Sequence, residues 1–175
     1  MTEYKSTAQH SKEIRQELKR RHGWNSRQVS VITDTYSMGS SIRIAIKNPG
    51  VPISKVKAVA DEHERIDRDG WGNILSGGNR FVFVDYSYEA RQELGRPYVA
   101  ELEALPVEPN GGTLYPVKGR LSKPLAYVGR HGNDTFPEFR VSFTTPESDV
   151  GTIQPINGLE HAAFQIGLHA LECGS

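Results

Sequence analysis

The sequence predicts an α+β protein, in which an N-terminal α-β-β-α-β unit with an antiparallel hairpin precedes a small β-β-α C-terminal part. Three observations lead to this fold class. Two stretches rich in β-branched residues lie close together at 29–36 and 41–47. Stretches of helical period flank them at 7–22 and 53–66. Beyond the Pro- and Gly-rich segment 106–112, two short strand patterns precede another helical one.

The first helix is expected over residues 7–22. Ser6 or Thr7 suits its N-cap, and Gly23 suits the left-handed position that ends a helix. Its apolar stripe is thin and consists of Ala8, Ile14 and Leu18. A helix with so few apolar residues needs a tertiary partner to be stable.

The hairpin follows from strict alternation in residues 41–47, where Ile42, Ile44 and Ile46 share one face. Its turn is expected at 37–40. A second helix is predicted over 53–66, with Ser54 as a candidate cap and His63 as a partly buried residue among surface carboxylates. A Gly- and Asn-rich loop at 67–79, a strand at 80–86 and a short helix at 87–94 complete this part.

The C-terminal part shows a different pattern. Strands are expected at 125–129 and 139–144, a loop at 146–158 and a helix at 159–171. The segment 106–112 looks like a linker, so the predicted domains are 1–105 and 113–175.

The charge is unevenly distributed although it sums to zero, with 21 Lys and Arg against 21 Asp and Glu. Residues 1–57 carry a net charge of +7, residues 58–105 carry −5 and residues 106–175 carry −2. Two surfaces are therefore candidates for partners. The basic one, for nucleic acid or an acidic partner, comprises Lys12, Arg15, Lys19, Arg20, Arg43 and Lys47. The acidic one, for a protein partner, comprises Asp61, Glu62, Glu64, Asp67, Asp69 and Trp71.

Trp71 leaves two interpretations open. An exposed Trp in a Gly-flanked loop is a common interface anchor. Burial against the core is at least as common for this residue type.

No arrangement typical of an active site or metal site stands out. His63 and Asp67 lie one helical turn apart, but the second His of a zincin motif is absent. The spacing of His131, Asp134, His161 and His169 gives no reason to assemble them into a catalytic set. We therefore expect no catalytic residue, no cofactor and no metal, hence a non-enzymatic protein.

Three stretches in the N-terminal part resemble a known module. They are the helical Glu13–Lys19, the strand entry Tyr36–Ile42, and Phe83–Tyr86 followed by Arg91. In this order, over about residues 7–95, the chain resembles the large polyvalent protein-associated domain, type twenty-nine, of phages and conjugative elements. The resemblance implies a mobile-element context and supplies no catalytic residues.

The function expected from the sequence is that of a phage or mobile-element protein that inhibits a host defence system by binding a protein complex. The alternative is a nucleic-acid-binding accessory protein that uses the basic helix and hairpin. No apolar window is long enough to span a membrane, and no secretory signal is visible. The expected location is therefore the cytoplasm of the host bacterial cell, with the oligomeric state open.

Overall fold

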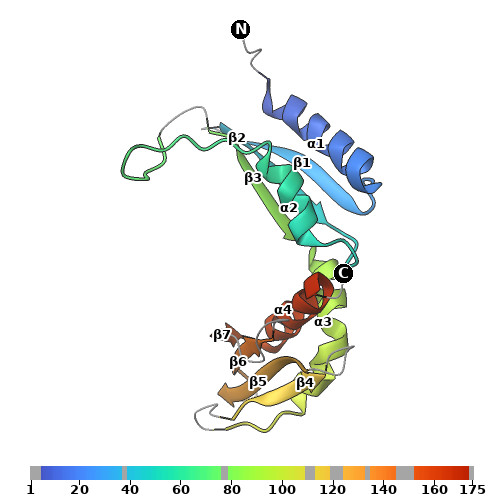
Figure 1. Cartoon of the computed structure of the whole chain (residues 1–175), viewed down its shortest axis with the longest axis vertical. Coiled ribbons are helices and arrows are strands. Elements are labelled where there is room, and N and C mark those ends of the chain that lie inside the picture. Colours follow the sequence, from blue (N-terminus) through green and yellow to red (C-terminus); the bar gives the residue numbers. More distant parts are fainter. Residues whose placement is uncertain are drawn as a thin grey trace. The chain divides into compact units, whose positions relative to one another are not determined.

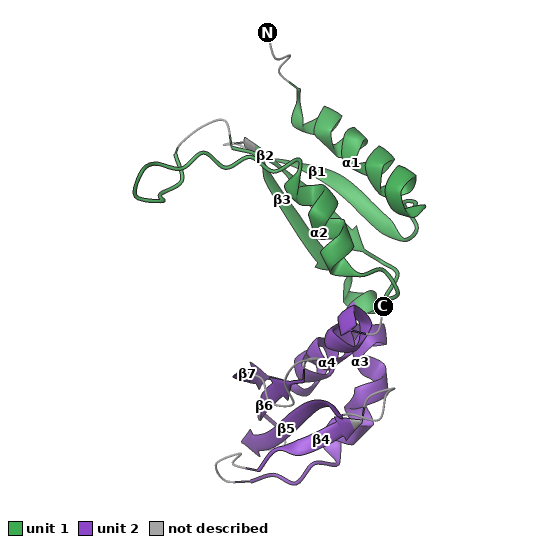
Figure 2. Ribbon diagram, viewed as in Figure 1, with its two compact units in different colours: residues 1–90 green, residues 91–175 purple. Residues whose placement is uncertain are grey.

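The computed structural model describes residues 5–36, 39–75, 79–108, 113–118, 124–132, 135–144 and 152–173. The chain forms two compact units, residues 1–90 and 91–175 (Figure 2), and the predicted α+β class is confirmed. The division falls after Ala90, earlier than the linker expected at 106–112. Within that segment Val107 pairs with Arg130 in a parallel bridge, and residues 109–112 lie outside the described residues.

Unit 1 is built on a three-stranded sheet whose central strand is β2 (Gly39–Ile46). Strand β1 (Val29–Tyr36) pairs with it antiparallel, which confirms the hairpin, and β3 (Phe81–Tyr86) pairs with it parallel. Residues 37 and 38 of the expected turn lie outside the described part of the chain. Helices α1 (Thr7–His22) and α2 (Ile53–Asp61) lie against the sheet (Figure 1).

Helix α1 begins and ends where the sequence predicts. The Ser6 hydroxyl accepts a hydrogen bond from the Gln9 amide, while the Gln9 side chain accepts one from the Ser6 amide, which makes a capping box. Gly23 ends the helix with a φ of 74°. Ile14 and Leu18 are buried against the sheet, whereas Ala8 is not.

Helix α2 is shorter than expected. It ends at Asp61 instead of continuing to residue 66, and it begins after Pro52 with no side-chain cap. The reason lies in Arg65, whose backbone exchanges two hydrogen bonds with Arg80 (N···O 3.0 and 2.7 Å). This bridge needs an extended backbone, which a helix cannot supply.

The sheet face opposite to Ile42 and Ile44 exposes both apolar and charged side chains. Ile32, Arg43 and Phe83 are neighbours across the three strands, and all three are exposed. Arg43 forms an ion pair with Asp34 on the adjacent strand at 2.8 Å.

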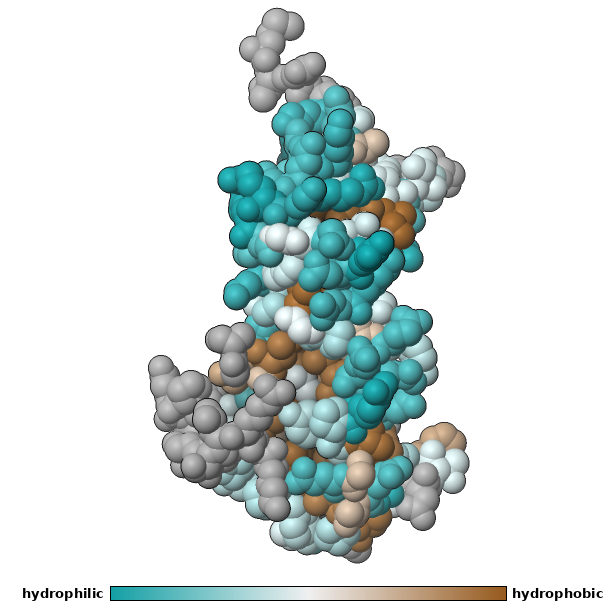
Figure 3. Space-filling model, turned by 90° about the vertical axis from the view of Figure 1, so that its right-hand side faces the viewer, coloured by the Kyte–Doolittle hydropathy of each residue, from teal (hydrophilic) through white to brown (hydrophobic). Residues whose placement is uncertain are grey.

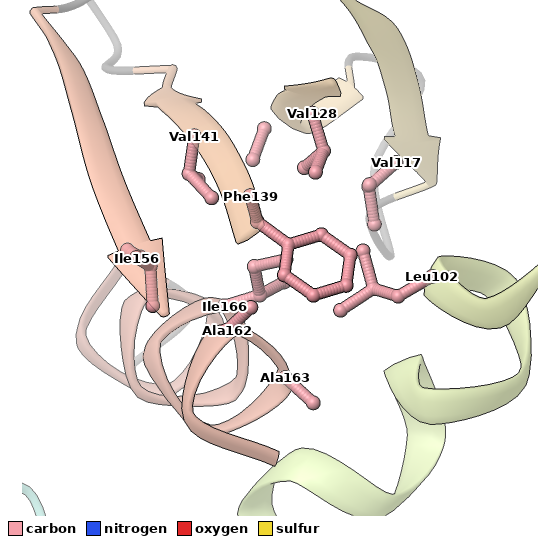
Figure 4. Packing of buried hydrophobic residues seen from close by; sticks show 10 residues of the cluster. Leu102, Val117, Val128, Phe139, Val141, Ile156, Ala162, Ala163 and Ile166 are labelled. Carbon is pink, nitrogen blue, oxygen red and sulfur yellow. The ribbon is translucent and has the colours of Figure 1, made fainter. Parts of the chain in front are cut away.

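Unit 2 has a four-stranded antiparallel sheet and a helical layer. The strands, in spatial order, are β4 (Tyr115–Lys118), β5 (Pro124–Gly132), β6 (Pro137–Phe143) and β7 (Ile153–Asn157). Helix α4 (Leu159–Cys173) packs on the sheet. Phe139 lies among the buried side chains, between Leu102 and Ile166 (Figure 4).

Strands β5 and β6 and helix α4 confirm the sequence predictions, but the two outer strands were missed. Strand β4 was not predicted, and β7 lies within the stretch 146–158 that was expected to be a loop. Both are edge strands and both contain a proline, Pro116 or Pro155. Proline is tolerated at a sheet edge, but it weakens the sequence pattern of a strand. Residues 145–151 lie outside the described ranges.

Helix α3 (Tyr88–Glu103) is twice the predicted length of 87–94 and continues through Pro97. Its packing explains this. Leu102 belongs to the apolar cluster of unit 2, and Tyr98 and Val99 pack against that cluster. A Cβ placed on Gly167 of α4 would clash with the carbonyl oxygen of Leu94, so the backbones of the two helices are in close contact there. None of the described helices is long and apolar enough to cross a membrane.

Candidate functional site

The segment that joins α2 to β3 leaves the sheet and returns to it as a long loop (Figure 1). The Arg65–Arg80 bridge closes its base, and a second antiparallel bridge joins Arg68 to Ile74 farther out. The backbone of Leu75 donates to Asp67 at 2.8 Å between these two bridges. The described arms of the loop are therefore tied to each other by backbone hydrogen bonds.

Asp69 organises the tip of this loop. Its carboxylate accepts hydrogen bonds from the amides of Trp71 (2.9 Å) and Asn73 (2.8 Å) and from the side chain of Asn73 (3.0 Å). The Asn73 side chain, followed by the Asn73 amide, holds the pKa of Asp69 below its ordinary value. Gly72 has a φ of 85°, a conformation that glycine adopts at little cost.

Trp71 projects from this tip with 93% of its surface exposed. This decides between the two interpretations that the sequence left open, because the indole does not fold back onto the core. Ile74 and Leu75 of the same loop are also about half exposed, at 48% and 46%. The loop therefore presents one large aromatic side chain with two aliphatic ones along the returning arm.

The carboxylates predicted to accompany Trp71 are largely engaged within the chain. Glu62 pairs with Arg21 through both oxygens (2.5 and 2.6 Å), and the hydrogen bond from Arg21 lowers the pKa of Glu62. Asp67 pairs with Arg65 at 3.1 Å. Glu64 accepts the Val82 amide at 3.2 Å, and Asp61 is exposed at the end of α2. The negative charge of this region is therefore partly compensated, and Trp71 is its most distinctive feature.

The structure places the predicted basic residues on different surfaces. Lys12, Arg15, Lys19 and Arg20 lie on α1. Arg43 lies on the opposite face of the sheet, on a strand whose Ile42 and Ile44 are buried, and Lys47 is exposed just after that strand. The view in Figure 3 shows a predominantly hydrophilic surface over unit 1.

A shallow hollow of about 160 Å³ lies beside the C-terminal half of α1. Arg15, Lys19 and Trp24 contribute to its lining. Arg15 also donates to the Val31 carbonyl oxygen (2.7 Å from Nη2), which fixes its guanidinium, and His22 stacks on Trp24 with ring centroids 4.4 Å apart. The hollow therefore combines positive charge with an aromatic ring.

A cluster that the sequence analysis missed lies where α1 passes the residues after α2. The Nδ1 atoms of His10 and His63 are 3.3 Å apart, and Glu13 Oε2 lies 3.7 Å from the first and 4.0 Å from the second. His63 is 7% exposed, more deeply buried than the partial burial expected for it. Desolvation by burial, followed by the charge of Arg80, lowers the pKa of His10.

A signal for half of this cluster was present in the sequence. His10, Glu13 and Glu17 recur at intervals of three and four residues, so they share one face of the predicted helix. His63 is 53 residues away from His10, and no local pattern joins it to that face.

The histidines of unit 2 make separate local contacts. His131 lies 3.3 Å from Glu138, His161 contacts Gln165, and His169 contacts the Thr144 carbonyl oxygen at 2.7 Å. Asp134 lies outside the described residues.

Comparison with known proteins found no match to a protein-family model, to a curated protein or to a solved structure. The resemblance to the large polyvalent protein-associated domain therefore stays a prediction.

The order of the Trp71 loop should depend on the ionisation of Asp69. Because folding lowers the pKa of this carboxyl group, the loop is stabilised above the ordinary aspartate pKa of about 4. That stabilisation is lost as the pH falls through the lower value in the folded protein. In a Trp24→Phe background, the fluorescence anisotropy of Trp71 should therefore hold at pH 5 and drop only in stronger acid.

The matched control is Asp69→Asn in the same background. It should show low anisotropy at all these pH values, because the amide replaces one acceptor oxygen by a donor that cannot bind the Asn73 side chain in the same way. An anisotropy that is high and independent of pH in both proteins would contradict this role of Asp69.

Proposed function

We propose that the chain is a non-enzymatic interaction protein of a phage or mobile element that inhibits a host defence system, of the anti-restriction or anti-CRISPR type, by binding a protein complex. The observation that carries the proposal is the 93% exposure of Trp71 at the tip of a hydrogen-bonded loop. The resemblance over residues 7–95, which include this loop, supplies the mobile-element context.

The energetics favour Trp71 as the anchor of such a contact. Trp is among the residues that contribute most to protein–protein binding when they enter a pocket of the partner. The hydrogen bonds to Asp69 hold the tip before binding, so little conformational entropy is lost on association. Ile74 and Leu75 provide apolar surface on the same loop.

The Trp71→Ala variant should therefore lose both binding and inhibition. Truncating an interface hot spot costs about 2 kcal/mol or more, which corresponds to roughly a 30-fold weaker Kd. The measurement has two readouts: capture of a host complex on the immobilised full chain, and plating efficiency of a restricted phage on cells that express the protein.

Phe136→Ala is the matched control, because Phe136 is also an exposed aromatic residue (74%) but belongs to unit 2. It should retain capture and protection. Wild-type protein that gives no protection against any defence system tested would overturn the proposal. Equal losses in the two variants would overturn the role of Trp71.

A second candidate function, nucleic-acid binding, is favoured by the hollow beside α1. Cationic side chains bind phosphates, and an aromatic ring such as that of Trp24 stacks on an unpaired base. The exposed Lys12, Lys19 and Arg20 on the same helix extend this positive surface. Arg43, paired with Asp34, lies elsewhere.

A salt series with single-stranded and duplex DNA tests this candidate. The Lys19→Ala/Arg20→Ala double variant should reduce the slope of log K against log salt by about 2, or about 1 per lost phosphate contact. Lys55→Ala/Lys57→Ala on α2 is the control and should leave the slope unchanged. If the wild type does not bind DNA at low salt, this function is excluded while the Trp71 proposal stands.

A further inference from the structure

Two imidazoles and one carboxylate converge at the junction of α1 and the residues after α2. His10 and Glu13 are three residues apart on α1, and His63 approaches them from the loop. The Nδ1 atoms of His10 and His63 are 3.3 Å apart. Glu13 Oε2 lies 3.7 Å from Nδ1 of His10 and 4.0 Å from Nδ1 of His63. Ligand atoms that lie 2.0–2.1 Å from a tetrahedral Zn²⁺ are about 3.3–3.5 Å apart. The histidine pair already has this spacing, and Glu13 needs a shift of about half an ångström.

We propose that His10, Glu13 and His63 bind one divalent transition-metal ion, with Zn²⁺ as the best fit. Two imidazole nitrogens and one carboxylate oxygen form a His₂Glu ligand set, which zinc proteins use with a fourth position open to water or another ligand. Ca²⁺ and Mg²⁺ prefer oxygen ligands and fit this set poorly.

The residues around the cluster are arranged as outer partners of such a site. Glu13 uses Oε1 to accept a hydrogen bond from Lys5 (2.7 Å), while Oε2 faces the two imidazoles. Glu17 Oε1 lies 3.7 Å from His63 Nε2, the ring nitrogen on the other side from the cluster. A carboxylate in that position orients a metal-bound imidazole and increases its basicity.

The burial of the cluster suits a bound ion. The side chains of His63 and His10 are 9% and 14% exposed, whereas that of Glu13 is 32% exposed and leaves a path for entry. The nearby cations have partners within the chain. Lys5 pairs with Glu13, and Arg21 pairs with both Glu17 and Glu62. Arg80 donates to the His63 carbonyl oxygen. The local cations are thus largely engaged with anions or a carbonyl group.

A bound ion would join two segments that are distant in the sequence. His10 and Glu13 belong to the first helix, and His63 lies at the start of the loop that carries Trp71. Because the ligands are brought together only in the folded chain, the free energy of binding would stabilise the fold of unit 1. This proposal differs from the sequence-based expectation of no metal site, and it is independent of the proposed function.

The test is a metal titration of the full chain after dialysis against a chelator. Co²⁺ serves as a spectroscopic probe, and Zn²⁺ competes with it. We expect one Co²⁺ per chain with visible absorption typical of a nitrogen- and oxygen-bound tetrahedral ion, displaced by Zn²⁺ but not by Mg²⁺ or Ca²⁺. Zn²⁺ should also raise Tm by several degrees, because it binds the folded state.

Two ligand variants and one control test whether Glu13 and His63 hold the ion. Glu13→Gln should weaken binding at least about tenfold, since loss of even an outer-shell partner costs roughly 10–100-fold. His63→Leu, which keeps the volume of a buried side chain, should abolish the Co²⁺ spectrum. His161 is an exposed histidine on α4, so the control variant His161→Gln should bind Co²⁺ as the wild type does.

The proposal is overturned if the wild type binds neither Co²⁺ nor Zn²⁺, since the cluster is then a hydrogen-bonded histidine pair. It is also overturned if Glu13→Gln binds as tightly as the wild type, or if His161→Gln removes the spectrum. Should His63→Leu fail to fold by circular dichroism, Glu13→Gln decides the question, because Glu13 is partly exposed and is not part of the core.

Discussion

The packing of α1 on the sheet and on the residues that follow α2 is the constraint that holds the layers of unit 1 together. Helix α1 buries few apolar side chains, chiefly Ile14 and Leu18, although helices in proteins gain most of their stability from tertiary packing. Polar contacts supplement this small apolar area: Ser11 with Thr33 on the sheet, and Arg21 with Glu62 beyond α2. His63 lies at the centre of this junction, and Arg80, which closes the base of the loop, donates to its carbonyl oxygen. The position of the Trp71 loop is therefore set by the same residues that hold α1.

Both units have an apolar core, and they differ in the polar side chains that they bury. Among the described residues, the buried polar side chains are Ser11, Ser41 and His63 in unit 1 and Ser142 in unit 2, so His63 is the one of these four whose side chain is a common metal ligand. The core of unit 2 is an apolar cluster around Phe139, which is typical of a structural core. Trp71 and the proposed metal ligands all lie in unit 1. The interface proposal and the metal-site proposal therefore concern the same unit, although neither depends on the other.

The sequence predicted the elements whose pattern agrees with their packing. The alternating isoleucines of β2 correctly predicted the hairpin, and Ser6 and Gly23 correctly predicted the ends of α1. It failed where tertiary contacts outweigh local pattern. Edge strands β4 and β7 contain prolines, α3 continues past Pro97 because it packs on α4, and α2 ends early because Arg65 pairs with Arg80. The exposure of Trp71 and the contact between His10 and His63 depend on the tertiary structure, so no local sequence pattern could predict either one.

We propose that unit 1 gains stability at the junction of His10, Glu13 and His63 when a metal ion binds there. Hydrogen exchange of the backbone amides of α1, followed by mass spectrometry with and without Zn²⁺, tests it most directly. Zn²⁺ should slow exchange in α1 and in the residues around His63, while exchange in α4 stays the same. Equal exchange in α1 with and without Zn²⁺, or equal slowing across both units, would contradict it.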